Sequence, residues 1–282
     1  ALGTDELATR ALLDALTAMD LLTCDGQRYR ATELGARLGH DGDLRLIAEK
    51  EAFFARHWLD LAESVRTGRP RLAPWAERLE TDPEQARFFL RALVVLARET
   101  GPDLTGIAGF GAGNRVVDLG GGLGAYSAQL AAAGAQVTLV DLPRVVAWAE
   151  TELADLAPRA RDRITLVPTD LFAASAVTDI GTGHDGVLIS HLLHDLDDAD
   201  SVAALRRAAE LVRPGGTVVV FELPGDPAGT FGPLFDLMMR VETPGRARRL
   251  EELTDLMHRA GLTDVRVSDS HRLPHGVLTA RG

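Results

Sequence analysis

The chain has few of the features that mark secreted or membrane-spanning proteins. Only one of its 282 residues is a cysteine, Cys24, so an internal disulfide is excluded. We expect this side chain to be a small buried hydrophobe in a reducing compartment. No apolar run approaches the length that spans a bilayer, which excludes a transmembrane helix. The chain opens with Ala1-Leu2-Gly3 and lacks a signal-peptide pattern, so a cytoplasmic location is expected.

Basic residues are also in short supply. The chain has 30 lysines and arginines against 41 aspartates and glutamates, giving a formal net charge of −11 and a pI near 5.2. Such a surface repels a phosphate backbone, so we expect no nucleic-acid partner. The remaining composition, 46% hydrophobic with 28 glycines, is that of a soluble globular protein. The length allows two domains.

The first part of the chain combines helical and hairpin patterns. Apolar residues recur at helical spacing over Glu6–Leu22, and the turn dipeptide Asp25-Gly26 follows. Gln27–Arg30 can then form a short strand before Thr32 caps a second helix. The order of helix, hairpin and helix predicts a winged-helix fragment.

Further helical patterns cover Arg45–Val65 and Pro83–Arg98, separated by a loop that contains Pro74. A cluster of helix breakers follows from Gly101 to Gly113. Beyond it the pattern changes to short β-branched runs that alternate with helices. We therefore place a domain boundary near residue 103, between a mainly α part and an α/β part.

The second part has seven short apolar runs that read as strands, most of them with helical segments between. This alternation predicts a doubly wound α/β fold with a mostly parallel, seven-stranded sheet. The predicted strands are Arg115–Asp118, Gln136–Asp141, Ile164–Val167, Gly186–Ser190, Thr217–Glu222, Val265–Val267 and Val277–Thr279.

A glycine-rich turn directly follows the first of these strands, in the segment Val116–Gly124. Glycine lets a ligand approach the backbone closely, and the spacing of Gly120, Gly122 and Ala125 also satisfies the dinucleotide fingerprint. Asp141 ends the next strand, where a carboxylate can accept hydrogen bonds from both hydroxyls of a ribose. These residues indicate a nucleoside cofactor and suit either nicotinamide or S-adenosylmethionine.

Other residues separate these two cofactors. Asp118 before the glycines, Asp170 after the third strand and Arg213–Gly216 before the fifth are typical together of methyltransferases. The segment Arg115–Pro224 resembles the S-adenosylmethionine-dependent O-methyltransferases of the caffeic acid and anthracycline (carminomycin) type. Leu12–Leu38 resembles the winged-helix part of the same family's dimerisation domain. The motifs that carry the likeness are Asp118–Gly124, Asp141-Leu142-Pro143, Asp170-Leu171-Phe172 and His194–Asp198.

The resemblance implies two domains and a homodimer. Residues 1–102 would form a winged-helix-like dimerisation and acceptor-site domain that lacks the family's first helices. Residues 103–282 would form a Rossmann-like class I methyltransferase domain. The implied cofactor is S-adenosyl-L-methionine, with S-adenosyl-L-homocysteine as its product and no metal ion.

Carried over residue by residue, the likeness places Gly120 beside the amino-acid part of the cofactor and Asp141 on the ribose. Asp170 and Leu171 would surround the adenine. For Asp118 and Asp170, a helix cap or loop hydrogen bond is the alternative role. The expected cofactor-binding residues are Asp118, Gly120, Gly122, Asp141, Leu142, Asp170, Leu171, Phe172 and Ser190.

His194 follows the fourth strand and is the expected general base. A phenol has a pKa of about 10, and an imidazole can take its proton near neutral pH. The family flanks this histidine with two acidic residues. Glu222 fits the first, and Ala247 stands at the second position, so one carboxylate is missing there. We expect the histidines not to cluster with carboxylates as a metal site would, they do not form a zinc-type motif, and no metal site is expected.

The acceptor is expected to be a small aromatic molecule with a hydroxyl group, in keeping with bacterial secondary metabolism. Aromatic and methionine side chains on family helices would wall its site, although such residues are more often simply core. Leu196 replaces a tryptophan that the family usually has. The expected acceptor-binding residues are Trp58, Phe89, His191, Asp195, Phe235 and Met239.

Three alternatives remain open from the sequence. The same fold and cofactor serve hydroxylation, decarboxylation or pericyclic chemistry in relatives, and Ala247 keeps that alternative open. A DNA-binding regulator would use the winged-helix segment, against the acidic charge. A nicotinamide-dependent dehydrogenase would use the glycine turn. The acceptor's identity and the methylated position are not encoded in any motif.

Overall fold

The structure is a computed structural model that describes residues 3–268 and 275–282. Its contacts divide the chain into two compact units, one that ends at Phe54 and one that runs from Ala55 to Gly282. The helices between residues 55 and 103 fall in the second unit because they pack on its α/β part, as α6 does on α8. The domain boundary near residue 103 stays a prediction.

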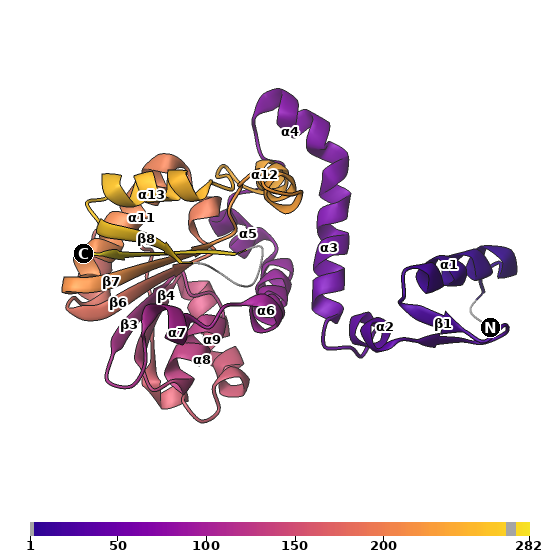
Figure 1. Cartoon of the computed structure of the whole chain (residues 1–282), viewed down its shortest axis with the longest axis horizontal. Helices are drawn as coiled ribbons and strands as arrows, with labels where there is room; N and C mark the ends of the chain where they lie inside the picture. Colours follow the sequence, from indigo (N-terminus) through magenta and orange to yellow (C-terminus); the bar gives the residue numbers. More distant parts are fainter. Residues whose placement is uncertain (1–2, 269–274) are drawn as a thin grey trace. The chain divides into compact units, whose positions relative to one another are not determined.

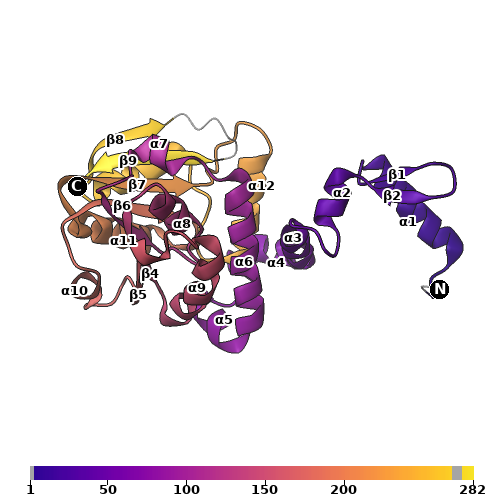
Figure 2. The ribbon, with the colours of Figure 1, turned by 90° about the horizontal axis from the view of Figure 1, so that it is seen from below.

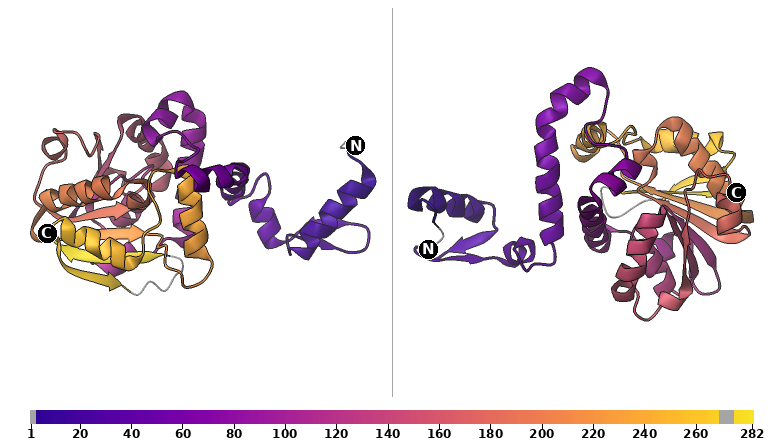
Figure 3. Two further views of the ribbon diagram at one scale, coloured as in Figure 1. Left: turned by 90° about the horizontal axis from the view of Figure 1, so that it is seen from above. Right: turned by 180° about the vertical axis from the view of Figure 1, so that it is seen from behind.

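In the first unit, two helices flank an antiparallel hairpin, as expected (Figure 3). Asp5 accepts a hydrogen bond from the Ala8 amide at the start of the first helix, and Thr32 accepts one from the Gly35 amide at the start of the second. The elements are α1 (Glu6–Ala18), β1 (Leu22–Cys24), β2 (Tyr29–Ala31), α2 (Glu33–Leu38) and the first residues of α3 (Arg45–His57).

Two expectations for the start of the chain were wrong. The first helix ends at Ala18, four residues before Leu22, because the chain turns at Asp20, which has a φ of 58°. Cys24 is exposed and not buried, and it lies at the end of a strand in a sheet of two strands.

The second unit begins with helices that the sequence predicted only in part. The pattern over Arg45–Val65 is broken into α3 and α4 by a 3₁₀ turn after His57. The segment after Pro74, expected as loop, holds a short helix, for which Pro74 takes the N-cap position. The elements are η1 (Trp58–Asp60), α4 (Leu61–Thr67), α5 (Trp75–Thr81), α6 (Pro83–Thr100) and α7 (Leu104–Ala108).

All seven predicted strands are present and form one sheet in the order β5-β4-β3-β6-β7-β9-β8. The first five run parallel, and β9 pairs antiparallel with both β7 and β8. This confirms the doubly wound, mostly parallel sheet. The strands are β3 (Arg115–Leu119), β4 (Gln136–Asp141), β5 (Ile164–Pro168), β6 (His184–Ser190), β7 (Val212–Glu222), β8 (Thr263–Ser268) and β9 (Gly276–Arg281).

Helices cover both faces of this sheet (Figures 1 and 2). On β3, Val117 and Leu119 pack on the side of α10, α11 and α13, and Val116 packs on the side of α7, α8 and α9. A strand buried on both faces reads as a continuous apolar run. The remaining elements are α8 (Ala125–Ala132), α9 (Pro143–Leu156), η2 (Arg161–Arg163), α10 (Ala176–Ile180), η3 (Leu193–Asp195), α11 (Asp198–Leu211), α12 (Phe231–Glu242) and α13 (Leu250–Arg259).

The strand order reverses at β3, which lies between β4 and β6. In open α/β sheets a ligand binds in the crevice at the carboxyl ends of the strands beside such a reversal. Leu119, Asp141, Ser190 and Glu222 are the last residues of β3, β4, β6 and β7, so they lie at this edge. Within the ranges described, no helix is long and apolar enough to cross a bilayer.

Candidate active site

The chain leaves β3 in a tight turn made of glycines. Gly120, Gly122 and Gly124 have φ angles of 75°, 56° and 88°, in the left-handed region that favours glycine. At Gly124 a Cβ atom would lie 2.7 Å from the Cδ2 atom of Leu153, so a larger residue would have to displace that side chain and adopt an unfavourable φ. At Gly122 the nearest atom to such a Cβ is 3.9 Å away, so the turn leaves room beside this backbone.

Asp118 lies below this turn and is fully buried. Its Oδ2 atom accepts a hydrogen bond of 2.7 Å from the hydroxyl of Ser127, and its buried Oδ1 atom has no hydrogen-bond partner in the part of the chain described. Burial raises the pKa of Asp118 to about 6, and the charge of Asp141 adds to this rise. A buried acceptor without a partner can accept a hydrogen bond from a bound water or ligand.

Asp141 connects the end of β4 to the glycine turn. Its Oδ2 atom accepts the backbone amide of Gly122 at 2.8 Å, and its Oδ1 atom accepts the amide of Leu142 at 2.7 Å. Burial raises the pKa of Asp141 to about 6 despite these two bonds. A carboxylate has about four lone-pair sites, so two acceptor positions remain on a group whose orientation is fixed.

The loop after β5 carries the other residues expected near the adenine. Asp170 is exposed, and its Oδ1 atom accepts the amide of Phe172 at 2.9 Å, which is the loop hydrogen bond considered as an alternative role. The Phe172 side chain is 42% exposed. The carbonyl of Leu171 accepts a bond from Arg207, and Ser190 is buried at the end of β6. Their contact with a cofactor stays a prediction.

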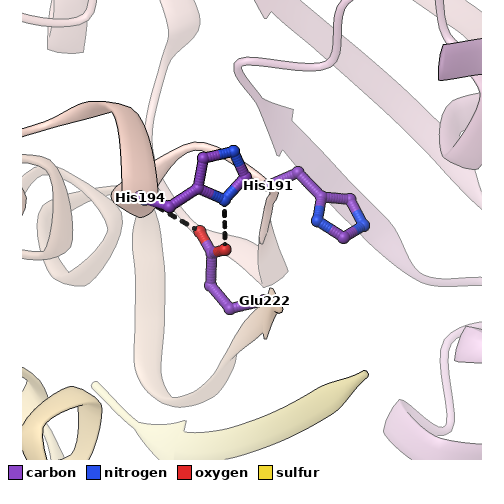
Figure 4. Close-up of side chains that lie close together, drawn as sticks. All are labelled: His191, His194 and Glu222. Atoms are coloured by element: carbon purple, nitrogen blue, oxygen red, sulfur yellow. Dashed lines mark hydrogen bonds and ion pairs between the residues drawn. The ribbon is translucent and has the colours of Figure 1, made fainter. Parts of the chain in front are cut away.

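His194 and Glu222 form a close pair at the ends of β6 and β7 (Figure 4). The Nδ1 atom of His194 lies 2.6 Å from the Oε2 atom of Glu222. The Oε1 atom of Glu222 accepts the backbone amides of Leu193 at 2.7 Å and of His194 at 3.3 Å. The carboxylate therefore fixes both the imidazole ring and the turn that carries it.

The two side chains are charged in opposite senses. Burial lowers the pKa of His194, but the charge of Glu222 and the hydrogen bond to it outweigh burial and raise the pKa to about 9. Burial raises the pKa of Glu222, and the charge of His194 brings it down to about 2. Because the carboxylate accepts the hydrogen on Nδ1, Nε2 is the nitrogen left to exchange a proton with another molecule.

Apolar side chains pack at the position where the family's second acidic residue is missing. Ala247 is 5% exposed and belongs to a small apolar cluster with Phe235 and Met239. A different carboxylate lies near the outer nitrogen of the imidazole: the Oδ1 atom of Asp195 is 3.9 Å from Nε2 of His194. Asp195, expected as an acceptor-binding residue, therefore lies beside the base.

His191 lies beside the pair without a bond to it (Figure 4). Its φ of 52° is unusual for a residue other than glycine, and its amide donates to the carbonyl of Phe221 at 2.8 Å. Burial lowers the pKa of His191 to about 3, so the ring is neutral. Ligand atoms of His191, His194 and Glu222 lie within 4.8 Å of one another, so the histidines do cluster with a carboxylate, against expectation. The short bond from His194 to Glu222 is nevertheless that of a hydrogen-bonded pair.

The remaining acceptor-side residues lie on or around α12. The ring of Phe235 is 5.3 Å from that of His194, and Met239 is buried one turn further along the same helix. Trp58 is half-buried in η1, which packs against α12. Phe89 on α6 lies 5.9 Å from the ring of Trp75. Phe235 is thus beside the base, while acceptor contacts of all these residues stay predictions.

One residue that the sequence did not single out holds the turn of the base. Arg248 is 2% exposed and donates to the carbonyls of Leu193 at 2.6 Å and of Leu196 at 2.8 Å. It also bonds Asp198 at 2.8 Å. A buried arginine needs such acceptors. The only sequence signal for such a role is that Arg248 directly follows Ala247, in the loop where the family has its second acidic residue.

Comparison with known proteins agrees with this geometry. The O-methyltransferase domain family matches residues 58–263. The 3-hydroxy-5-methyl-1-naphthoate 3-O-methyltransferase of Streptomyces sahachiroi is 31% identical over 280 residues, covering 94% of this chain and 78% of its own. The 2,7-dihydroxy-5-methyl-1-naphthoate 7-O-methyltransferase of Streptomyces carzinostaticus is 32% identical over 277 residues, covering 89% and 77%.

A solved structure of similar fold is that of NcsB1, an O-methyltransferase from neocarzinostatin biosynthesis, in complex with S-adenosylmethionine and 2-hydroxy-5-methyl naphthoic acid. It is 29% identical with a TM-score of 0.77, and the match covers 99% of this chain and 86% of that one. The matched range, residues 58–263, includes both the glycine turn and the pair of His194 and Glu222. The chain belongs to the O-methyltransferase family.

Proposed function

We propose that the protein transfers the methyl group of S-adenosylmethionine to a hydroxyl of a small aromatic acceptor, with His194 as the general base. The observation that carries this proposal is the 2.6 Å bond between His194 and Glu222 at the carboxyl edge of the sheet. The naphthoate methyltransferases named above support the choice of an aromatic acceptor.

The residues at the end of β3 and β4 fit this cofactor. The two free acceptor positions of Asp141 match the two hydroxyls of a ribose. The unpartnered Oδ1 atom of Asp118 and the room beside Gly122 provide for polar groups of a ligand close to the backbone. When bound, the cofactor supplies a methyl group on a positively charged sulfur, already activated for transfer.

The chain's own task is then to orient the acceptor and accept its proton. A phenol with a pKa of about 10 and an imidazole with a pKa of about 9 exchange a proton with little loss of free energy. Glu222 keeps the hydrogen of the imidazole on Nδ1, so Nε2 faces the acceptor as the basic atom. Only the neutral fraction of His194, on the order of 1% at pH 7, is ready to act, and turnover rises with pH.

We also propose that residues 1–102 form the winged-helix dimerisation domain and that the enzyme is a homodimer. In α1 no residue is buried, and Leu7 and Leu12 on the helix and Met19 directly after it are exposed by 77%, 60% and 65%. Exposed apolar side chains along one helix favour a protein partner. Sedimentation of the full chain would test this state.

Binding and product analysis test the function together. Calorimetric titration with S-adenosylmethionine, S-adenosylhomocysteine and NAD should show binding of the first two alone. Incubation with S-adenosylmethionine and a naphthol should give methyl ether and S-adenosylhomocysteine in equal amounts. Binding of NAD alone, or an acceptor altered without formation of S-adenosylhomocysteine, would contradict the proposal.

His194→Ala tests the base. We expect methyl transfer to fall by about 10²- to 10⁴-fold, the usual contribution of a general base, with little change in cofactor affinity. His258→Ala, on the far helix α13, serves as a matched control and should keep wild-type turnover. Full activity of His194→Ala would remove His194 from the mechanism.

A further inference from the structure

The side chain of Arg78, on α5, packs against two aromatic rings that also contact each other. Its guanidinium carbon lies 4.9 Å from the ring centre of Trp75 and 5.6 Å from that of Phe89. The side chain is only 13% exposed. Contact with two rings that are tilted by 59° to each other restricts the movement of the guanidinium group.

The hydrogen-bonding capacity of this group is only partly used. Its Nη1 atom lies 3.5 Å from the Oε1 atom of Glu242, which is a long ion pair. Its Nη2 atom is buried and has no hydrogen-bond partner among the residues described. Buried donors in folded proteins are almost always paired, so an orphan of this kind indicates a missing acceptor.

Helix α12 relates Arg78 to the base. Phe235, Met239 and Glu242 are buried along one face of this helix, at spacings of four and three residues. Phe235 contacts the ring of His194 at one end of that face, and Glu242 pairs with Arg78 at the other. Seven residues of helix span roughly 10 Å, so the two points on α12 that contact the base and Arg78 are separated by about the length of a substituted two-ring arene.

We propose that Arg78 binds a carboxylate of the acceptor, so that the preferred substrates are aromatic hydroxy acids whose hydroxyl reaches His194 while the acid group reaches Arg78. This inference rests on the proposed function and names its substrate class. The carboxylate would complete the bonding of Nη2 and orient the arene along α12.

The shape and charge of the site favour a carboxylate over other groups. A carboxylate conjugated with an arene lies in or near the ring plane, and a guanidinium group accommodates it through two parallel hydrogen bonds. Trp75 and Phe89 offer flat apolar surfaces beside that plane. A neutral hydroxyl would use one donor and add no negative charge beside Arg78, whose ion pair to Glu242 is long.

The experiment compares 6-hydroxy-2-naphthoate, its methyl ester and 2-naphthol as acceptors for the wild type and for Arg78→Met and Arg78→Lys. Methionine keeps an apolar stem beside the two rings but removes the charge. We expect the wild type to prefer the acid over the ester by about 10- to 100-fold in kcat/KM, which is the contribution of one charge-assisted hydrogen bond. Most of this difference should come from KM. Arg78→Met should lose this preference, and Arg78→Lys should keep part of it.

Arg240→Met is the matched control, since it removes an exposed positive charge from α12 and should leave the preference intact. Because Arg78→Met removes a positive charge from beside the buried Glu242, the double variant with Glu242→Gln and a thermal melt separate misfolding from lost recognition. Calorimetry with 2-naphthoate, which has no hydroxyl to methylate, measures the anchor without catalysis. Weaker binding by Arg78→Met than by the wild type is expected.

Two results would overturn the inference: a wild type that prefers the ester or the naphthol, or an Arg78→Met variant that loses activity equally on all three acceptors. Failure of the proposed function looks different. In that case the wild type would neither bind S-adenosylmethionine nor methylate any of the three, whereas failure of the carboxylate site leaves the ester and the naphthol as good substrates.

Discussion

Replacing Glu222 with glutamine tests the catalytic pair most directly. The Oε1 atom of Glu222 accepts two backbone amides, from Leu193 and His194, so the amide oxygen of the introduced glutamine would take that position. Its NH₂ group would then face Nδ1 of His194. A donor at that position forces the hydrogen of the neutral imidazole onto Nε2, the atom that must accept the proton of the hydroxyl.

The size of the change follows from the charges. Without the carboxylate, burial dominates, and the pKa of His194 falls from about 9 to below about 6.5, its value in an unfolded chain. The lost interaction is on the order of 3 kcal/mol. A histidine with a raised pKa stabilises the fold below pH 6.5 and loses this effect as pH rises through 9, and Glu222 contributes above about pH 4.5. The loss of stability in Glu222→Gln should therefore be greatest between about pH 4.5 and 6.5 and vanish above pH 9.

The assay is kcat/KM for methylation of a naphthol between pH 5 and 10. The wild type should rise with pH and level off near pH 9. Glu222→Gln should level off below about pH 6.5, at a plateau lower by about 10²- to 10⁴-fold because the wrong tautomer prevails. Glu210→Gln, an exposed substitution on α11, controls for the loss of one charge. A variant profile that still levels off near pH 9 would refute the assignment.

Two further predictions concern the neighbouring residues. Asp141→Asn places an NH₂ group against one of two backbone amides, so affinity for S-adenosylmethionine should fall by about 10- to 100-fold in calorimetry, and unchanged affinity would contradict a role on the ribose. Arg248→Met removes the bonds to the carbonyls of Leu193 and Leu196, so kcat should fall by about 10- to 100-fold while cofactor affinity holds. Wild-type kcat in a folded Arg248→Met would show that this clamp does not position His194.

The sheet was predictable from the sequence because its signals are local. Each parallel strand is a short apolar run, and the glycines of residues 120–124 can be recognised without knowing their neighbours in space. The helix Trp75–Thr81 was missed because seven residues give too little periodicity to distinguish a helix from a loop. The 3₁₀ turn after His57 could not be predicted either, because the hydrophobic spacing continues through it and hides the break between α3 and α4.

The pair of His194 and Glu222 was predicted through the family resemblance, because 28 residues separate its members in sequence. The place of Asp195 beside Nε2 could not be predicted, since it depends on how the turn after β6 is held. The same is true of Arg248, whose bonds reach back more than 50 residues, and of Arg78, whose unpaired donor is defined only by what surrounds it. Contacts of this range depend on tertiary packing.

The bonds that clamp the turn of His194 affect the order in which the site forms during synthesis of the chain. Thr243 and Arg248 bond backbone carbonyls of residues 193–196, and Gly245 packs so tightly on His194 that a side chain there would strike its carbonyl. The strands of the glycine turn leave the ribosome about a hundred residues earlier than this clamp. Domains fold as units, and the clamp lies in the same compact unit as the glycine turn. A nascent chain should therefore leave the turn of His194 without its clamp until the residues up to 248 have emerged from the ribosome.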